Sequence, residues 1–161
     1  MEFELRPEQG VPPVLLGATL AAARSALQGL GFLAVEDFRR AHDEPGALFF
    51  TGPAGRVSGF VYGDEDGRVV AIEIANPNPR NAPGEGQDAV VYSGLDVFST
   101  PAPDVIEALY AGTVVEVDGD SVIVPDLFME FSLGGEHHDR VDDDGGATFF
   151  SGVLLAGEGY Y

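Results

Sequence analysis

Short apolar runs, each closed by a cluster of turn-forming residues, constrain the fold of this chain more than any other feature. Residues 69–75 alternate apolar side chains with Ala71 and Glu73, which is the period of a strand with one buried face and one wet face. Residues 57–62 precede this segment across the turn cluster 63–67, so the two segments are expected to form a hairpin. The face predicted to be buried holds Val70, Ile72 and Ile74.

Two helices interrupt the predicted strands. Thr19 is the expected N-cap of the first helix, and Gly29 and Gly31 are expected to end it. Its apolar stripe comprises Leu20, Ala23, Leu27 and Leu30. The second helix precedes Gly112, has proline in its first turn and Ser99 or Thr100 as its expected cap, and presents Val105, Ile106 and Leu109 inward. Further strands are predicted over residues 3–5, 32–35, 48–51, 90–98, 113–117, 122–124, 128–132 and 148–156.

These elements predict an α+β fold in which two helices pack on one face of a mostly antiparallel sheet. The length of 161 residues favours a single domain, 1–161. A helix followed by strands occurs twice, so residues 1–75 and 90–161 are interpreted as divergent repeat halves that a Pro/Gly-rich loop, 76–89, connects. Chance recurrence of a capped helix is an equally weighted alternative.

Negative charge is the most unusual property of the composition. The chain has 27 acidic side chains and 8 arginines, a net charge of −19. Residues 1–80 hold 11 acids and 7 arginines, a net of −4, whereas residues 81–161 hold 16 acids and 1 arginine, a net of −15. Such a field repels nucleic acids and anionic membranes and attracts a basic protein surface. Solubility alone is an equally weighted reading.

The densest acidic segment supplies the predicted partner-binding residues. These are Glu116, Asp118, Asp120, Asp126, Glu130, Glu136, Asp139, Asp142, Asp143 and Asp144. Carboxylates at this density repel one another, and a chain tolerates them for solubility or for a cationic partner. We therefore expect them to form one exposed anionic face.

No pattern in the sequence predicts a catalytic, metal or cofactor site. Adjacent His137 and His138 point to opposite faces of a strand, so they do not converge on one ion. The acidic run 142–146 fails the calcium-loop spacing, and the G-x-G-x-x-A match at 84–89 does not bridge a strand to a helix. The chain has neither cysteine nor lysine, which excludes thiolate and Schiff-base chemistry.

Location is predicted from what the sequence lacks. No apolar run approaches the roughly 20 residues that span a bilayer, and residues 1–6 do not resemble a secretion signal. A cytoplasmic protein is therefore expected.

Four segments resemble small bacterial immunity proteins, which are encoded beside the toxins that they neutralise. They are Leu16-Gly-Ala-Thr19 at a helix start, Leu95-Asp-Val-Phe98, Val124-Pro-Asp-Leu-Phe128 and the closing residues 153–161. The resemblance implies a non-enzymatic immunity protein or antitoxin that remains a monomer until it covers the basic cleft of a toxin, such as one acting on nucleic acids. Two alternatives stay open, a structural or regulatory interaction module and a carboxylate-dependent hydrolase.

Overall fold

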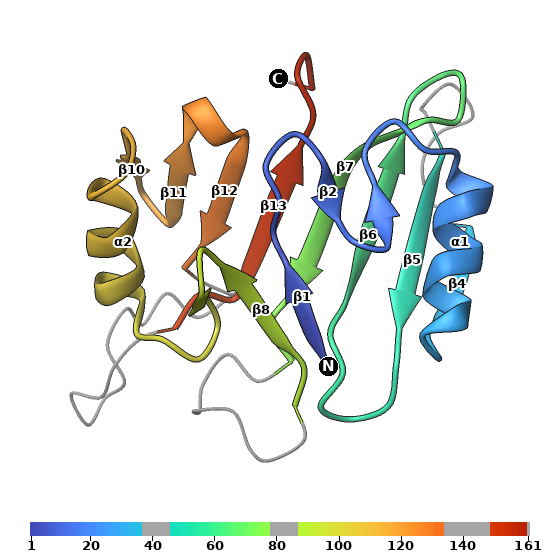
Figure 1. The fold of residues 1–161 in the computed structure, drawn as a ribbon, viewed down its shortest axis with the longest axis horizontal. Coiled ribbons are helices and arrows are strands. Elements are labelled where there is room, and N and C mark those ends of the chain that lie inside the picture. Colours follow the sequence, from blue (N-terminus) through green and yellow to red (C-terminus); the bar gives the residue numbers. More distant parts are fainter. Residues whose placement is uncertain (37–45, 78–86, 134–148, 161) are drawn as a thin grey trace.

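An eight-stranded sheet forms the framework of the protein (Figure 1). The computed structural model describes residues 1–36, 46–77, 87–133 and 149–160. The strand order is β10-β11-β12-β13-β7-β6-β5-β4, and every neighbouring pair is antiparallel. The strands are β4 (Leu33–Glu36), β5 (Ala47–Thr51), β6 (Ser58–Gly63), β7 (Val69–Ala75), β10 (Glu116–Asp118), β11 (Ser121–Val124), β12 (Met129–Ser132) and β13 (Gly152–Ala156).

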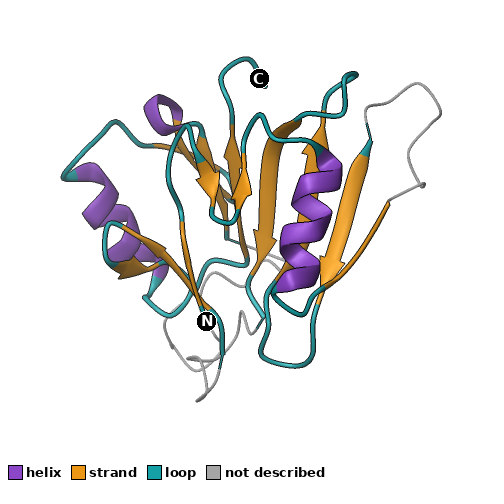
Figure 2. Cartoon of the chain, turned by 45° about the vertical axis from the view of Figure 1, so that its right-hand side comes forward, coloured by secondary structure: helices purple, strands orange, loops and turns teal. Residues whose placement is uncertain are grey.

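The remaining elements form a second layer on one face of this sheet (Figures 1 and 2). They are the helices α1 (Leu20–Gly29) and α2 (Ala102–Tyr110), the three-stranded sheet of β1 (Glu2–Glu4), β8 (Ala89–Tyr92) and β9 (Leu95–Asp96), and the hairpin of β2 (Gly10–Val11) and β3 (Val14–Leu15). A short 3₁₀ helix, η1 (Pro125–Leu127), connects β11 to β12. The predicted α+β architecture, with the helices packed on a mostly antiparallel sheet, is confirmed.

One hydrophobic core lies between the two layers and draws on both halves of the chain. On the first half Val61 and Ile72 are buried beneath Leu27 of α1, and on the second half Phe131 packs against Phe150 with ring centroids 5.0 Å apart. Alternate residues of each strand point into this core because successive side chains leave a strand on opposite faces. The other set of alternate residues therefore forms the opposite face of the sheet.

The two helix starts differ from each other in how they are capped. Thr19 caps α1 as predicted, because its Oγ1 accepts a hydrogen bond of 3.1 Å from the backbone N–H of Ala22. The predicted cap of α2 at Ser99 or Thr100 is wrong, since α2 begins after Pro101 without a side-chain cap. The carboxylate of Asp96 instead accepts the backbone N–H groups of Phe98 and Ser99, and this Asx turn leads the chain into the helix.

Two details of the predicted strands are also wrong. The run expected over 90–98 is a hairpin of β8 and β9, which turns at Ser93 and Gly94, where both φ angles are positive (51° and 83°). In β7, Val70 does not share the buried face with Ile72 and Ile74 as predicted. A bulge shifts the register between β6 and β7, so that Gly63 pairs with Val69. Val69 is consequently the core residue and Val70 is only half-buried.

The strand order has a pseudo-twofold arrangement. In the first half α1 precedes the meander β4 to β7, and in the second half α2 precedes the meander β10 to β13. The last strands of the two meanders, β7 and β13, pair antiparallel at the middle of the sheet. This arrangement is the one that a helix-then-strands repeat would generate, and it joins both halves in one sheet.

A buried carboxylate fixes the small sheet to the large one. The side chain of Asp88, just before β8, is 1% exposed and receives Arg56 Nε at 2.7 Å, the backbone N–H of Val57 at 3.0 Å and the Met1 ammonium at 3.3 Å. Arg56 in turn lies over the ring of Phe32, 4.1 Å from its centroid. Asp88 thereby holds the segment before β6 against the start of β8.

Replacing Asp88 with alanine is expected to lower the free energy of unfolding by about 3 kcal/mol, because the partly buried Arg56 guanidinium and the buried backbone N–H of Val57 lose their acceptor. Urea denaturation followed by circular dichroism would measure the loss. Glu4→Gln is the matched control, since Glu4 pairs with Arg6 at 2.7 Å on the surface, where such a pair contributes at most about 1 kcal/mol. Equal losses in the two variants would contradict the structural role assigned to Asp88.

Candidate functional site

The face of the eight-stranded sheet that points away from the helices is the candidate site, here called the open face. No described helix or small sheet packs on it. Its side chains belong to the alternate residues that do not enter the main core. Ala47, Ala71 and Ala156, for example, are buried on this side but lie outside the core cluster.

The strand register aligns one residue from each strand across the whole open face, a set called here the central row. From β10 to β4 the central row is Glu116, Ile123, Glu130, Leu154, Glu73, Phe60, Phe49 and Val35. The row therefore changes character along its length. Carboxylates alternate with apolar side chains on the β10 side, and aromatic and aliphatic side chains follow on the β4 side.

The three carboxylates of the central row are separated by two strands each, which corresponds to about 10 Å between neighbours. Neighbouring side chains hold two of them. Ser121 Oγ donates to Glu130 Oε1 at 2.7 Å, and Tyr62 Oη donates to Glu73 Oε2 at 2.6 Å. Both bonds leave the second carboxylate oxygen of each glutamate for a further donor. All three acids are therefore regularly spaced, and Glu73 and Glu130 are also oriented by a hydrogen bond.

Aromatic rings cover the β5 and β6 part of the open face. Phe49 and Phe60 have ring centroids 5.3 Å apart, and Phe60 stacks on Tyr62 at 5.9 Å with an angle of 18° between their planes. Tyr160 extends the group, 6.5 Å from Tyr62. All four rings remain partly exposed. Tyr62 joins the aromatic part of the face to its acidic part through its bond to Glu73.

The described arginines lie away from these acids. Arg6 pairs with Glu4, Arg56 pairs with Asp88, Arg68 donates to the carbonyl of Gly17, and Arg24 belongs to α1 in the other layer. Within the described ranges no basic side chain forms an ion pair with the open-face acids, which are Glu73, Glu116, Asp118 and Glu130. The field of these four carboxylates is therefore directed outward.

The predicted partner-binding residues fall into three groups. Glu116, Asp118 and Glu130 lie on the open face. Asp120 is in the turn between β10 and β11, and Asp126 is exposed in η1 at the other end of β11. The remaining five lie outside the described residues, namely Glu136, Asp139, Asp142, Asp143 and Asp144.

One member of the face was not among the predicted site residues. Glu73 was expected to point to solvent, and it does so, but it is 43 residues before Glu116 in the chain. Its position beside the second-half acids depends on the pairing of β7 with β13, and no local pattern of the sequence encodes that pairing.

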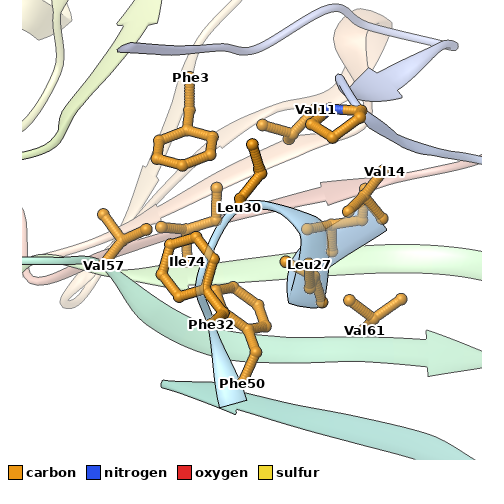
Figure 3. Close-up of a pocket in the computed structure, with 12 residues that line it drawn as sticks. Phe3, Val11, Val14, Leu27, Leu30, Phe32, Phe50, Val57, Val61 and Ile74 are labelled. Atoms are coloured by element: carbon orange, nitrogen blue, oxygen red, sulfur yellow. The ribbon is translucent and has the colours of Figure 1, made fainter. Parts of the chain in front are cut away.

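An apolar cavity among the described residues does not provide a ligand site (Figure 3). It lies between α1, the N-terminal strands and the large sheet, and its walls are apolar, including Phe3, Leu27 and Ile74. The volume open to the centre of a water molecule is about 20 Å³, enough for about one water and far below the size of a bound metabolite. The cavity is therefore a small packing defect of the core.

The structure also bears on the predicted hairpin turn, on metal binding and on membrane-spanning helices. Asp64 Oδ1 accepts the backbone N–H groups of Asp66 and Arg68, both at 2.9 Å, as expected of a hairpin turn. Residues 1–36, 46–77, 87–133 and 149–160 contain no cluster of three or more side chains that could hold a metal ion. His137, His138 and the acidic run 142–146 lie outside them. Among the described helices, neither is long and apolar enough to cross a membrane.

Comparison with known proteins gives no relative: no family model, curated protein or solved structure matches the chain.

Proposed function

We propose that this protein binds a basic protein through the open face and thereby neutralises it, as an immunity protein or antitoxin does. One observation carries the proposal. The acids Glu73, Glu116, Asp118 and Glu130 share a face on which no described arginine pairs with them. A partner with arginine or lysine side chains would supply the missing countercharges.

The composition of the face suits protein recognition. Apolar Ile123 and Leu154 lie between the acids of the central row, and aromatic rings follow on β5 and β6. Interfaces combine apolar and aromatic anchors with charges that direct the approach of the partner. A nucleic acid is a poor fit to this face because its phosphate backbone would be repelled by the same carboxylates.

The resemblance to immunity proteins suggests which cationic partner to test. Toxins that act on nucleic acids carry basic clefts, and an acidic sheet face would block such a cleft by steric and electrostatic means. The gene adjacent to the one encoding this protein is the first candidate. Its product, expressed alone, should arrest growth, and co-expression of this protein should restore growth.

Neutralising the open face should abolish the protection. For Glu73→Gln, Glu116→Gln, Asp118→Asn and Glu130→Gln combined, we expect the dissociation constant for the toxin to rise about 100-fold, since each partly or fully exposed charge contributes about 0.7 kcal/mol. Isothermal titration at two salt concentrations would measure it. The salt dependence should weaken along with the affinity because fewer charges meet at the interface.

A control variant carries the same change in net charge. It combines Glu65→Gln, Asp66→Asn, Asp104→Asn and Glu107→Gln, all exposed residues outside the open face. It should bind and protect as the unchanged protein does. If the control loses protection to the same extent, net charge and not the open face determines binding. If the open-face variant protects fully, the proposal is wrong.

A further inference from the structure

The two edges of the eight-stranded sheet differ in how they are protected. At one edge β10 is only three residues long, and two of them are the exposed acids Glu116 and Asp118. Short length and charge are common means of preventing an edge strand from pairing with another chain. At the other edge β4 presents apolar side chains on the open face, where Leu33 is 63% and Val35 is 42% exposed. No described strand pairs with the outer side of β4.

The hydrogen-bond alternation determines which backbone groups of β4 face outward. The N–H of Gly63 donates to the carbonyl of Gly46 at 2.8 Å. Every second residue of an antiparallel strand bonds to the same neighbour, so Leu48 and Phe50, two and four residues after Gly46, also hydrogen-bond to β6. Phe49 and Thr51 consequently bond toward β4, where they oppose Val35 and Leu33. The N–H and C=O of Ala34 must therefore point away from the sheet, toward the free edge.

Charge on the sheet favours contact between copies at β4 and disfavours it at β10. β4 has one acid, its last residue Glu36, and β5 and β6 carry no charged side chain. By contrast, β10 and β12 carry Glu116, Asp118 and Glu130. Pairing two β10 edges would place these acids against each other. Pairing two β4 edges would hold the two acidic ends about 70 Å apart along the joined sheet, far beyond the screening length of about 8 Å.

We propose that β4 is a self-association edge, through which two copies pair antiparallel to form one continuous sheet. The twofold axis is normal to the sheet, so the open faces of both copies lie on the same side and each copy keeps its acidic end free. The contact extends the apolar surface formed by Leu33, Val35 and Phe49 within one copy. This proposal differs from the sequence-based expectation of a monomer before partner binding.

A single register satisfies both the backbone and the side chains. Ala34 faces Ala34 of the second copy as a hydrogen-bonded pair, because its peptide groups point outward. Leu33 then lies opposite Val35 of the second copy, in the closer, non-hydrogen-bonded type of pair. The strand is four residues long, so the interface is small, and we expect a dissociation constant on the order of 100 μM.

Two charge variants test this register. In Leu33→Lys/Val35→Lys, the substituted positions oppose each other across the twofold axis, so repulsion should raise the dimer dissociation constant at least tenfold. Leu33→Glu/Val35→Glu should behave alike. A 1:1 mixture of the two variants should form heterodimers, because lysine then lies opposite glutamate. Sedimentation equilibrium up to about 1 mM, with one variant labelled, would measure all three cases.

The control is Val114→Lys/Val117→Lys, which makes the same charge change at exposed apolar residues near the β10 edge and should dimerise as the unchanged protein does. Hydrogen exchange gives an independent measurement. The Ala34 amide should be protected in the dimer and exchange freely in the lysine variant. The proposal fails if the unchanged protein is a monomer at 1 mM, if the mixture yields no heterodimer, or if the Ala34 amide is equally protected in the monomeric variant.

Discussion

Gly59→Ala is expected to prevent stable folding. Gly59 lies in β6 opposite Ile74 of β7, and a Cβ atom added there would overlap the carbonyl oxygen of Glu73 and approach Phe50 Cζ to 3.1 Å. Both strands are in the interior of the sheet, so the clash with backbone cannot be relieved by rotating a side chain. We expect a loss of more than about 4 kcal/mol in the free energy of unfolding, enough to unfold a domain of ordinary stability.

The control for this substitution is Gly29→Ala. Gly29 ends α1, and no atom lies within 4 Å of the Cβ that alanine would add. Alanine has a higher helix propensity, so the variant should match the original protein or gain up to about 1 kcal/mol. Thermal denaturation of both variants would compare them directly. A folded Gly59→Ala protein with an unchanged midpoint would show that β6 and β7 are farther apart than described.

Phe131→Ala should have the second largest effect. Phe131 is fully buried on β12, and its ring contacts that of Phe150 with centroids 5.0 Å apart. Removing the ring opens a cavity in the core of the second half, and a loss of about 4 kcal/mol is expected in chemical denaturation. The matched control is Phe60→Ala on the open face, where the ring is only partly buried and the expected loss is about 1.5 kcal/mol. Equal losses would contradict the assignment of the two faces.

The sequence predicts those features of the fold that are determined by residues close together in the chain. Thr19 caps α1 because a cap requires only residues within one turn, and Glu73 faces outward because strand alternation is local. The hairpin turn at Ser93 and Gly94 was missed because the apolar residues on both sides read as one strand. The bulge at Val70 was missed because it exists only relative to the register with β6.

The candidate site was predictable only in part for the same physical reason. Glu116, Asp118 and Glu130 could be selected by acidic density, since they lie close together in the chain. Charge counting alone does not separate them from Asp120, which lies in the turn between β10 and β11, or from Asp126, which lies in η1. An acid shares the face only if it lies in a strand and at one of the alternate positions that point to that face, and both conditions depend on the lengths of the strands and of the hairpin turns. The addition of Glu73 required the order of strands in the sheet, which is a tertiary property.

The position of β13 has a consequence for biosynthesis. This strand follows every other described strand in sequence, yet it lies between β12 and β7 at the middle of the sheet. Until the ribosome has released residues 152–156, the two meanders cannot join, and each exposes an apolar inner strand. Such long-range closure slows folding and leaves unpaired edges open to aggregation. A nascent chain of this protein should therefore expose its unpaired strands, and be prone to aggregation, until β13 emerges.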